Sequence, residues 1–155
     1  MDHLETLQVL ESCELFKGLE KSNIDQIADL CREKTYKAGE YVFRQGDFGE
    51  YLYIIAEGHI FLERSMALGT QKGNAVIGVL GKGRVLGCWS ILLSEPDNHM
   101  SSAACQKPTK VVAIQGSDLR EMMLNNMEFG FKVLENLCLS LRDRIQGAYG
   151  AMEKI

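Results

Sequence analysis

The stretch from residue 37 to residue 62, KAGEYVFRQGDFGEYLYIIAEGHIFL, decides the fold. Glycines interrupt it every few residues, and the runs between them are rich in β-branched and aromatic side chains. Runs of this kind favour brief β-strands joined by tight turns. Within YLYIIA, residues 51–56, Leu52 and Ile54 point to one face and the apolar side chains between them to the other. We therefore expect both faces of this strand to be covered.

Two further runs, AVIGVL at 75–80 and KVVAIQ at 110–115, have the same character. Several short strands with frequent turns are typical of a jelly roll, so residues 35–116 are predicted to form a double-stranded β-helix of the cupin type. The chain has 155 residues, of which 46% are hydrophobic, which suits one well-buried domain. The sequence thus predicts a single, mainly β domain over residues 1–155 with flanking helices.

Helices are expected at both ends, over residues 1–34 and 117–155. Apolar residues recur at near-helical spacing from Leu4 to Leu19, and Ser22 is placed to cap a second helix. After the last strand, Ser117 is placed to cap a third helix, with Asp118 near the positive end of its dipole.

A longer helix is predicted next, from Phe131 to Met152. Its apolar residues recur at alternating intervals of three and four, as in a helix that packs along a partner helix. This seam consists of Phe131, Leu134, Cys138, Leu141, Ile145, Ala148 and Met152. The helix could lie on its own β-roll or pair with its copy in a homodimer, and we favour the homodimer.

Charge and composition limit the possible partners and the compartment. The net charge is −4 and the basic residues are scattered, so DNA binding by this chain alone is not expected. The N-terminus carries acidic residues where a signal peptide is positive, and no apolar run approaches the roughly 20 residues of a membrane helix. Five cysteines without a CxxC pair suit a reducing compartment. We expect a cytoplasmic protein without a membrane segment.

The sequence shows no recognisable catalytic or metal-binding pattern. The three histidines lie in unrelated segments, without HxH or HExxH spacing. The glycine-rich segment GKGRVLG, residues 81–87, lacks the third glycine of a dinucleotide fingerprint and the Ser or Thr of a Walker loop. Tight turns between strands explain these glycines better, and an enzyme is not expected.

Four segments together resemble one known family. They are residues 37–62, VIGVLGKGRVLG at 76–87, KVVAIQGSDLREMMLNN at 110–126 and FKVLENLCLSLRDRI at 131–145. In order and spacing they resemble the cyclic nucleotide-binding domains shared by catabolite activator protein relatives and kinase regulatory subunits. The resemblance covers nearly the whole chain and implies that a small ligand binds inside the β-roll.

The resemblance also implies that LGCWSILLSEPDNHMSSAAC, residues 86–105, is the phosphate-binding cassette. In the family, a helix start and an arginine hold the cyclic phosphate, and a glutamate holds the ribose 2′-hydroxyl. Here Cys88 stands at the glutamate position and His99 at the arginine position. The ligand-binding residues implied by resemblance are Gly87, Cys88, Trp89, Ser90, His99, Ser101 and Ser102.

These replacements predict weak or altered cyclic nucleotide binding. No arginine lies between Arg84 and Arg120, and the loss of a bidentate arginine from a desolvated phosphate site costs about 2 to 4 kcal/mol, roughly 30- to 1000-fold in affinity. A protonated His99 could replace part of that contact, which predicts tighter binding near about pH 6 than near about pH 8. The alternative is that His99 is a solvated loop residue. Trp89 is expected to pack into the roll or plug the pocket.

The favoured interpretation is an intracellular sensor module of the cyclic nucleotide-binding type. The sequence specifies no cofactor, and a cyclic nucleotide is the expected ligand. One alternative is the sensor half of a transcription regulator whose helix-turn-helix follows Ile155. A second is a haem-binding gas sensor that uses His99 and Cys88 as axial ligands. A third is a dimerisation domain that binds no ligand.

Overall fold

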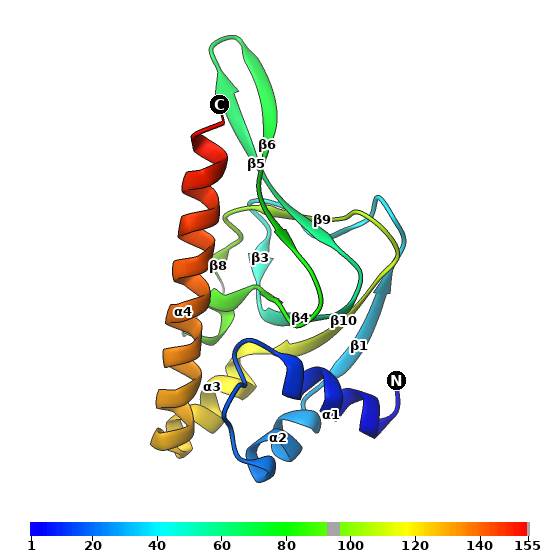
Figure 1. Ribbon diagram of the computed structural model, residues 1–155, viewed down its shortest axis with the longest axis vertical. Coiled ribbons are helices and arrows are strands. Elements are labelled where there is room, and N and C mark those ends of the chain that lie inside the picture. The colour runs from blue at the N-terminus through cyan, green and yellow to red at the C-terminus, as the bar shows by residue number, and fades with distance from the viewer. Residues whose placement is uncertain (93–96, 155) are drawn as a thin grey trace.

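The computed structural model describes residues 1–92 and 97–154. It forms a β-roll with the short helices below it and the long last helix along one flank (Figure 1). Within these residues the chain opens with two short helices, then forms ten strands and a 3-10 turn, and closes with two helices. In chain order the elements are α1 (His3–Ser12), α2 (Lys21–Ala28), β1 (Arg32–Tyr36), β2 (Tyr41–Phe43), β3 (Phe48–Gly49), β4 (Tyr51–Glu57), β5 (Ile60–Leu68), β6 (Gln71–Leu80), β7 (Val85–Leu86), η1 (Cys88–Ile91), β8 (Asp97–Asn98), β9 (Ser102–Cys105), β10 (Thr109–Gln115), α3 (Gly116–Asn125) and α4 (Met127–Met152).

Two antiparallel sheets make the roll. One has the strand order β1-β10-β4-β7 and the other β2-β9-β5-β6, while β3 and β8 form a separate pair. The sequence neighbours β9 and β10 lie in different sheets, and so do β4 and β5, so the chain passes from one sheet to the other as a jelly roll does. The predicted fold class is confirmed.

Strand β4 separates two hydrophobic cores. Leu52 and Ile54 pack against the helices, and Tyr53 and Ile55 face the interior of the roll. All four side chains are at most 8% exposed. The alternation in YLYIIA therefore has the predicted consequence, because one face of the strand faces the helix layer and the other lines the roll.

The first helix is shorter than predicted, since α1 ends at Ser12 and not near Leu19. Beyond it the chain turns, so that Leu15 and Phe16 enter the core. The side-chain amide of Asn136 in α4 donates to the carbonyls of Leu15 and Lys17, at 2.8 and 3.0 Å. The apolar spacing in this segment reflects burial against α4, and a contact so distant in sequence leaves no local signal.

Both predicted serine caps are wrong. Helix α2 begins at Lys21 and α3 at Gly116, each one residue before the serine, and neither has a cap hydrogen bond from a described side chain. Strand β10 runs directly into α3, so the preceding strand fixes where that helix starts. Strands β1, β7, β8 and β9 lie outside the predicted strand runs, and β1 begins inside the predicted helical region 1–34.

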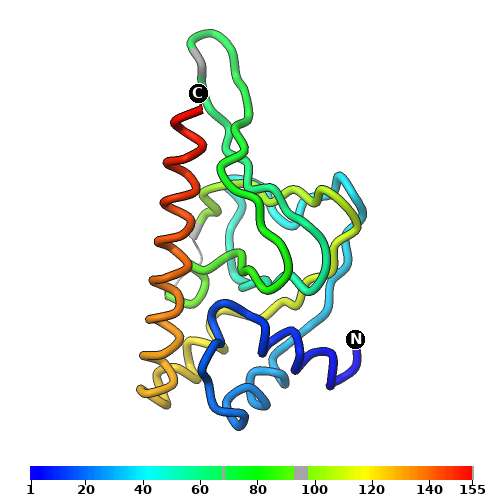
Figure 2. Tube along the Cα trace, in the orientation of Figure 1, coloured from blue at the N-terminus to red at the C-terminus, as the bar shows by residue number. Residues whose placement is uncertain are grey.

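Helix α4 lies along the roll, and its C-terminal half approaches the projecting β5–β6 hairpin (Figures 1 and 2). It packs on the helix-side core through Phe129, Val133 and Leu137. Most of the predicted seam faces away from that core. Its exposed members, which we call the α4 stripe, are Phe131, Leu134, Cys138, Ile145 and Met152.

Candidate functional site

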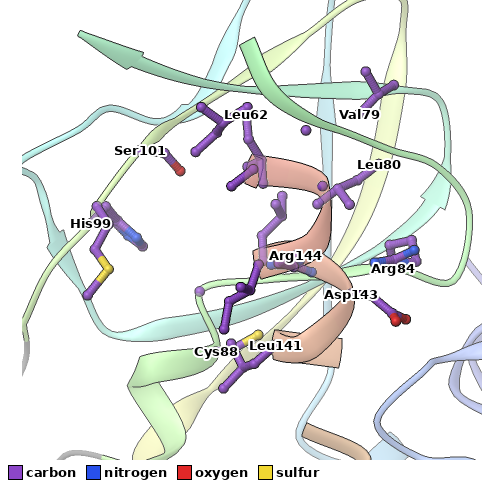
Figure 3. A pocket seen from close by; sticks show the side chains of 18 of the residues that line it. Leu62, Val79, Leu80, Arg84, Cys88, His99, Ser101, Leu141, Asp143 and Arg144 are labelled. Carbon is purple, nitrogen blue, oxygen red and sulfur yellow. The ribbon is translucent and has the colours of Figure 1, made fainter. Parts of the chain in front are cut away.

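A cavity of about 530 Å³ lies between the end of the roll and α4 (Figure 3). Apolar side chains from strands β2, β5, β6 and β7 and from α4 form most of its wall. They include Phe43, Leu62, Val79, Leu80, Leu86, Leu141 and Ile145. Its polar or ionisable side chains are those of Arg84, Cys88, His99, Ser101, Asp143 and Arg144. The cavity thus combines residues of the 86–105 segment with residues of a helix about 50 positions later.

Gly87 starts the turn that brings the 86–105 segment to the cavity. Its φ of 75° is left-handed, and a Cβ atom there would lie 2.3 Å from the Tyr51 carbonyl oxygen. The 3-10 turn η1 follows directly, and the Ser90 hydroxyl donates to the Gly87 carbonyl at 2.7 Å. Ser90 therefore stabilises the turn and is not among the residues that line the cavity.

Cys88 and Trp89 both line the cavity, but they differ in how far their side chains are exposed. Cys88 is buried, and burial raises the pKa of its thiol although the nearby Arg144 guanidinium lowers it in part. The thiol is therefore neutral at physiological pH. Trp89 is 38% exposed and forms part of the wall. The expectation that it plugs the pocket is wrong, because the cavity stays open beside it.

His99 lies against the aromatic ring of Phe43 in the cavity wall. The two rings are parallel within 4°, with their centroids 3.6 Å apart. Burial lowers the pKa of His99, and the smaller effect of the Asp47 carboxylate raises it. A lowered pKa means that the free protein holds a neutral imidazole at pH 7. This weakens the prediction that His99 serves as a phosphate-binding cation.

The two serines that follow His99 separate to different sites. Ser101 points toward the cavity (Figure 3). Ser102 lines a second, polar groove together with Tyr41, Arg44 and Glu63. Its hydroxyl accepts a hydrogen bond of 2.8 Å from the backbone N–H of Gln45. Neighbouring residues of a strand point to opposite faces, so only one of the two can reach the interior of the roll.

Arg144 is the cavity residue that sequence reasoning missed. It lies on the α4 face that also carries Val133, Leu137 and Ser140, all buried. A charged residue on an otherwise buried helix face is the signal that could have revealed it. Its guanidinium donates to the Val85 carbonyl, and its Nη2 atom lies 3.7 Å from Glu14 Oε2. Thus α4 is attached to β7 by a cation at the edge of the cavity.

Glu14 connects the same edge to the N-terminal segment. Its Oε2 atom accepts from Arg84 Nε and from the Val85 amide, each at 2.8 Å. Glu14 is only 12% exposed at its side chain, so these contacts are shielded from water. One carboxylate therefore holds the Arg84 side chain and the start of β7 and faces Arg144.

The remaining ionisable groups suggest no metal centre. Among residues 1–92 and 97–154, no three His, Cys, Asp or Glu side chains are placed to hold an ion. The five cysteines are free in this part of the chain. No helix that the structure describes is both long and apolar enough to cross a membrane. Residues 93–96 lie outside the described residues, and they include the first half of the cassette loop SEPDNH, residues 94–99.

Comparison with known proteins agrees with this architecture. Residues 33–126 match the model of the family described as the cyclic nucleotide-binding domain. The chain is 29% identical over 104 residues to the cyclic AMP receptor protein of Thermus thermophilus. The match covers 67% of this chain and 46% of the relative. It is 25% identical over 135 residues to the CRP-like cAMP-activated global transcriptional regulator of Mycobacterium tuberculosis. This match covers 87% of this chain and 58% of the relative.

A solved structure shows the same fold over nearly the full length. A cyclic nucleotide-binding domain from Methylobacillus flagellatus superposes with a TM-score of 0.79 at 21% identity, and the match covers 99% of this chain and 84% of the other. The fold defines a domain of the cyclic nucleotide-binding class, and its cavity lies between the roll and α4. The chain belongs to the cyclic nucleotide-binding domain family. It spans about half the length of the two regulators that it resembles.

Proposed function

We propose that this chain is a cytoplasmic sensor domain that binds a small effector of the cyclic nucleotide type with weakened or altered specificity. One observation carries the proposal: a single cavity of about 530 Å³ is bounded by both the 86–105 segment and α4. A ligand in that cavity contacts the roll and the helix at once. Its binding energy can therefore favour one placement of α4 over another.

The altered specificity is argued from the cassette residues. Cys88 offers a neutral thiol where the family offers a carboxylate, and His99 offers a neutral ring against Phe43. Ser102 is already bonded to the Gln45 amide on the other side of the strand. Each of these features removes a contact that the resemblance implies for ribose or phosphate. We expect cyclic AMP to bind more weakly than it does to a chain with the complete cassette.

The output is proposed to run through α4. The α4 stripe is apolar and exposed, and its side chains Phe131 and Met152 are 68% and 63% accessible. Exposed apolar surface of this kind marks an interaction site. We propose that two copies pair through it, so that a change in the position of α4 alters the pairing of two domains.

A ligand screen tests the proposal. Purified protein is heated with cyclic mononucleotides, cyclic dinucleotides or haem, and the unfolding midpoint is followed. A ligand at about 100 times its dissociation constant stabilises the fold by about 2.7 kcal/mol, which gives a clear rise in the midpoint. We expect cyclic AMP to raise the midpoint only at high concentration.

Other outcomes of the screen support other functions. No shift with any nucleotide would favour a dimerisation domain that binds no ligand. A shift and a Soret band with haem alone would favour the gas-sensor alternative, in which His99 and Cys88 bind the iron. Either result would contradict the proposed nucleotide effector.

A second candidate function is the sensor half of a transcription regulator. The similarity to the Mycobacterium tuberculosis regulator, which extends over 87% of this chain, favours it. The parent gene decides between the two: an open reading frame that continues past Ile155 into a helix-turn-helix would support the regulator. A stop codon directly after Ile155 would support a standalone module.

A further inference from the structure

The guanidinium of Arg144 is incompletely satisfied. Its Nη2 atom donates to the Val85 carbonyl and lies 3.7 Å from Glu14 Oε2, which is beyond hydrogen-bond length. That same carboxylate oxygen already accepts from Arg84 Nε and from the Val85 amide. The Nε atom of Arg144 is buried, and within residues 1–92 and 97–154 it has no hydrogen-bond partner. Arg144 also forms a side-chain hydrogen bond with Cys88. Arginine has five N–H donors, and the one on Nε is not used by any contact among the described residues.

The surroundings of Arg144 strengthen its attraction for an anion. Leu80, Leu86 and Leu141 line the cavity around it, and apolar walls of this kind keep the local dielectric constant low. Cys88, its neighbour, is a buried thiol and supplies no negative charge. Asp143 also lines the cavity, but its side chain is 50% exposed and its Oδ1 atom lies 3.7 Å from Arg142 Nη2. Glu14 is thus the principal competitor for the guanidinium.

The other candidates for an anion contact are weaker. Arg84 lines the cavity as well, but its Nε atom is bonded to Glu14 at 2.8 Å and its side chain is 35% exposed. Ser102 faces the second groove. Ser101 offers one hydroxyl without charge. Of the two arginines that line the cavity, Arg144 is therefore the less exposed, with 19% of its side chain accessible, and its Nε atom has no described partner.

We propose that Arg144 binds the anionic group of the effector, so that a nucleotide phosphate points toward α4 and not toward residues 99–102. This inference rests on the proposed function, because it assumes that a nucleotide enters the cavity. It has a regulatory consequence. A phosphate competes with the Val85 carbonyl and with Glu14 for the guanidinium, so ligand binding rearranges the contacts that attach α4 to β7.

The test compares two ligands in two matched variants. Arg144→Gln removes the cation at the cavity, while Arg142→Gln makes the same change two residues away on a side chain that is 65% exposed. Each protein is titrated calorimetrically with cyclic AMP and with adenosine, which lacks the phosphate. We expect Arg144→Gln to lower the affinity for cyclic AMP about tenfold or more and to leave that for adenosine nearly unchanged. Arg142→Gln should change both by less than about twofold.

The outcomes separate this inference from the proposed function. If the unmodified protein binds no cyclic nucleotide, the proposed function fails and the inference falls with it. If the protein binds cyclic AMP but Arg144→Gln behaves like Arg142→Gln, only the inference is overturned. An equal loss of cyclic AMP and adenosine in Arg144→Gln would also overturn it, because that pattern reports a damaged cavity and not a lost phosphate contact.

A third variant keeps the test decisive if Arg144→Gln does not fold. Glu14→Gln removes the competing charge but retains an oxygen that can accept from Arg84 and from the Val85 amide. The proposal predicts tighter cyclic AMP binding in this variant, because Arg144 is released toward the ligand. Unchanged or weaker binding of cyclic AMP in a folded Glu14→Gln protein would contradict it.

Discussion

At the scale of single residues, the site depends on a backbone conformation that only glycine adopts without strain. Gly87 lies in the left-handed region, and the carbonyl oxygen of Tyr51 occupies the space that a side chain would need. The turn that brings Cys88 and Trp89 to the cavity begins at this residue. Its conformation therefore determines the cavity wall as well as the local turn.

Replacing Gly87 with alanine should be more costly than replacing another left-handed glycine. Gly46 has a φ of 91°, but no described atom lies within 4 Å of its Cβ position. Gly46→Ala should therefore lose about 1 to 2 kcal/mol through backbone strain alone. Gly87→Ala should lose about 1 to 3 kcal/mol more, because its Cβ meets Tyr51. Urea denaturation of both variants measures the difference, and equal losses would show that the close contact is relieved without cost.

At the scale of secondary structure elements, α4 holds the N-terminal segment in place. Asn136 is 6% exposed and donates to two backbone carbonyls between α1 and α2. The backbone N–H of Glu14 donates to the carbonyl of Gly83 at 2.9 Å, which joins this segment to the turn before β7. The N-terminal helices, the roll and α4 are thus joined at one edge, close to the cavity.

Asn136→Ala should destabilise the protein by about 1 to 3 kcal/mol, because it leaves buried carbonyls without their donor. Asn125→Ala, at the exposed end of α3, is the matched control and should change stability by less than about 0.5 kcal/mol. Thermal unfolding of both variants checks the prediction. A loss in Asn136→Ala no larger than that in Asn125→Ala would mean that water replaces the amide at both carbonyls.

At the scale of the whole molecule, the α4 stripe is an exposed apolar surface on the last helix. Phe131, Leu134 and Ile145 are 68%, 39% and 52% exposed, although their spacing is that of a packed helix. The opposite face of α4 is covered by the helix-side core. A second copy paired along this stripe would bury it, which is the basis of the proposed homodimer.

Two leucine variants on α4 test the homodimer. Leu134 belongs to the stripe, whereas Leu139 is 48% exposed and lies five positions later, about 140° around the helix. Leu134→Glu should convert the dimer to a monomer, and Leu139→Glu should remain dimeric. Sedimentation equilibrium measures the mass of each protein. If the unmodified protein is monomeric, or if both variants dissociate alike, pairing through the stripe is contradicted.

The sequence by itself determined the class of fold. Alternation in YLYIIA and the ordered glycines specified a roll with both faces of β4 covered, because strand periodicity is a local property. The same local signals predicted the long last helix and its apolar seam. The resemblance to the cyclic nucleotide-binding domains, and not these local signals, implied that Gly87, Cys88, Trp89, His99 and Ser101 belong to the site, and all five line the cavity.

Only the tertiary structure decided what meets at the cavity. The direction of Ser102, the stacking of His99 on Phe43 and the arrival of Arg144 from α4 all depend on how distant elements pack. The segment that follows α1 is likewise held by Asn136, more than 100 residues away in sequence. Hydrophobic periodicity specifies which face of an element is buried, but it does not specify the partner. Side chains such as Arg144 and Asn136 acquire their roles only when two elements meet. A local pattern can mark such a polar residue on a buried helix face, but it does not identify the partner.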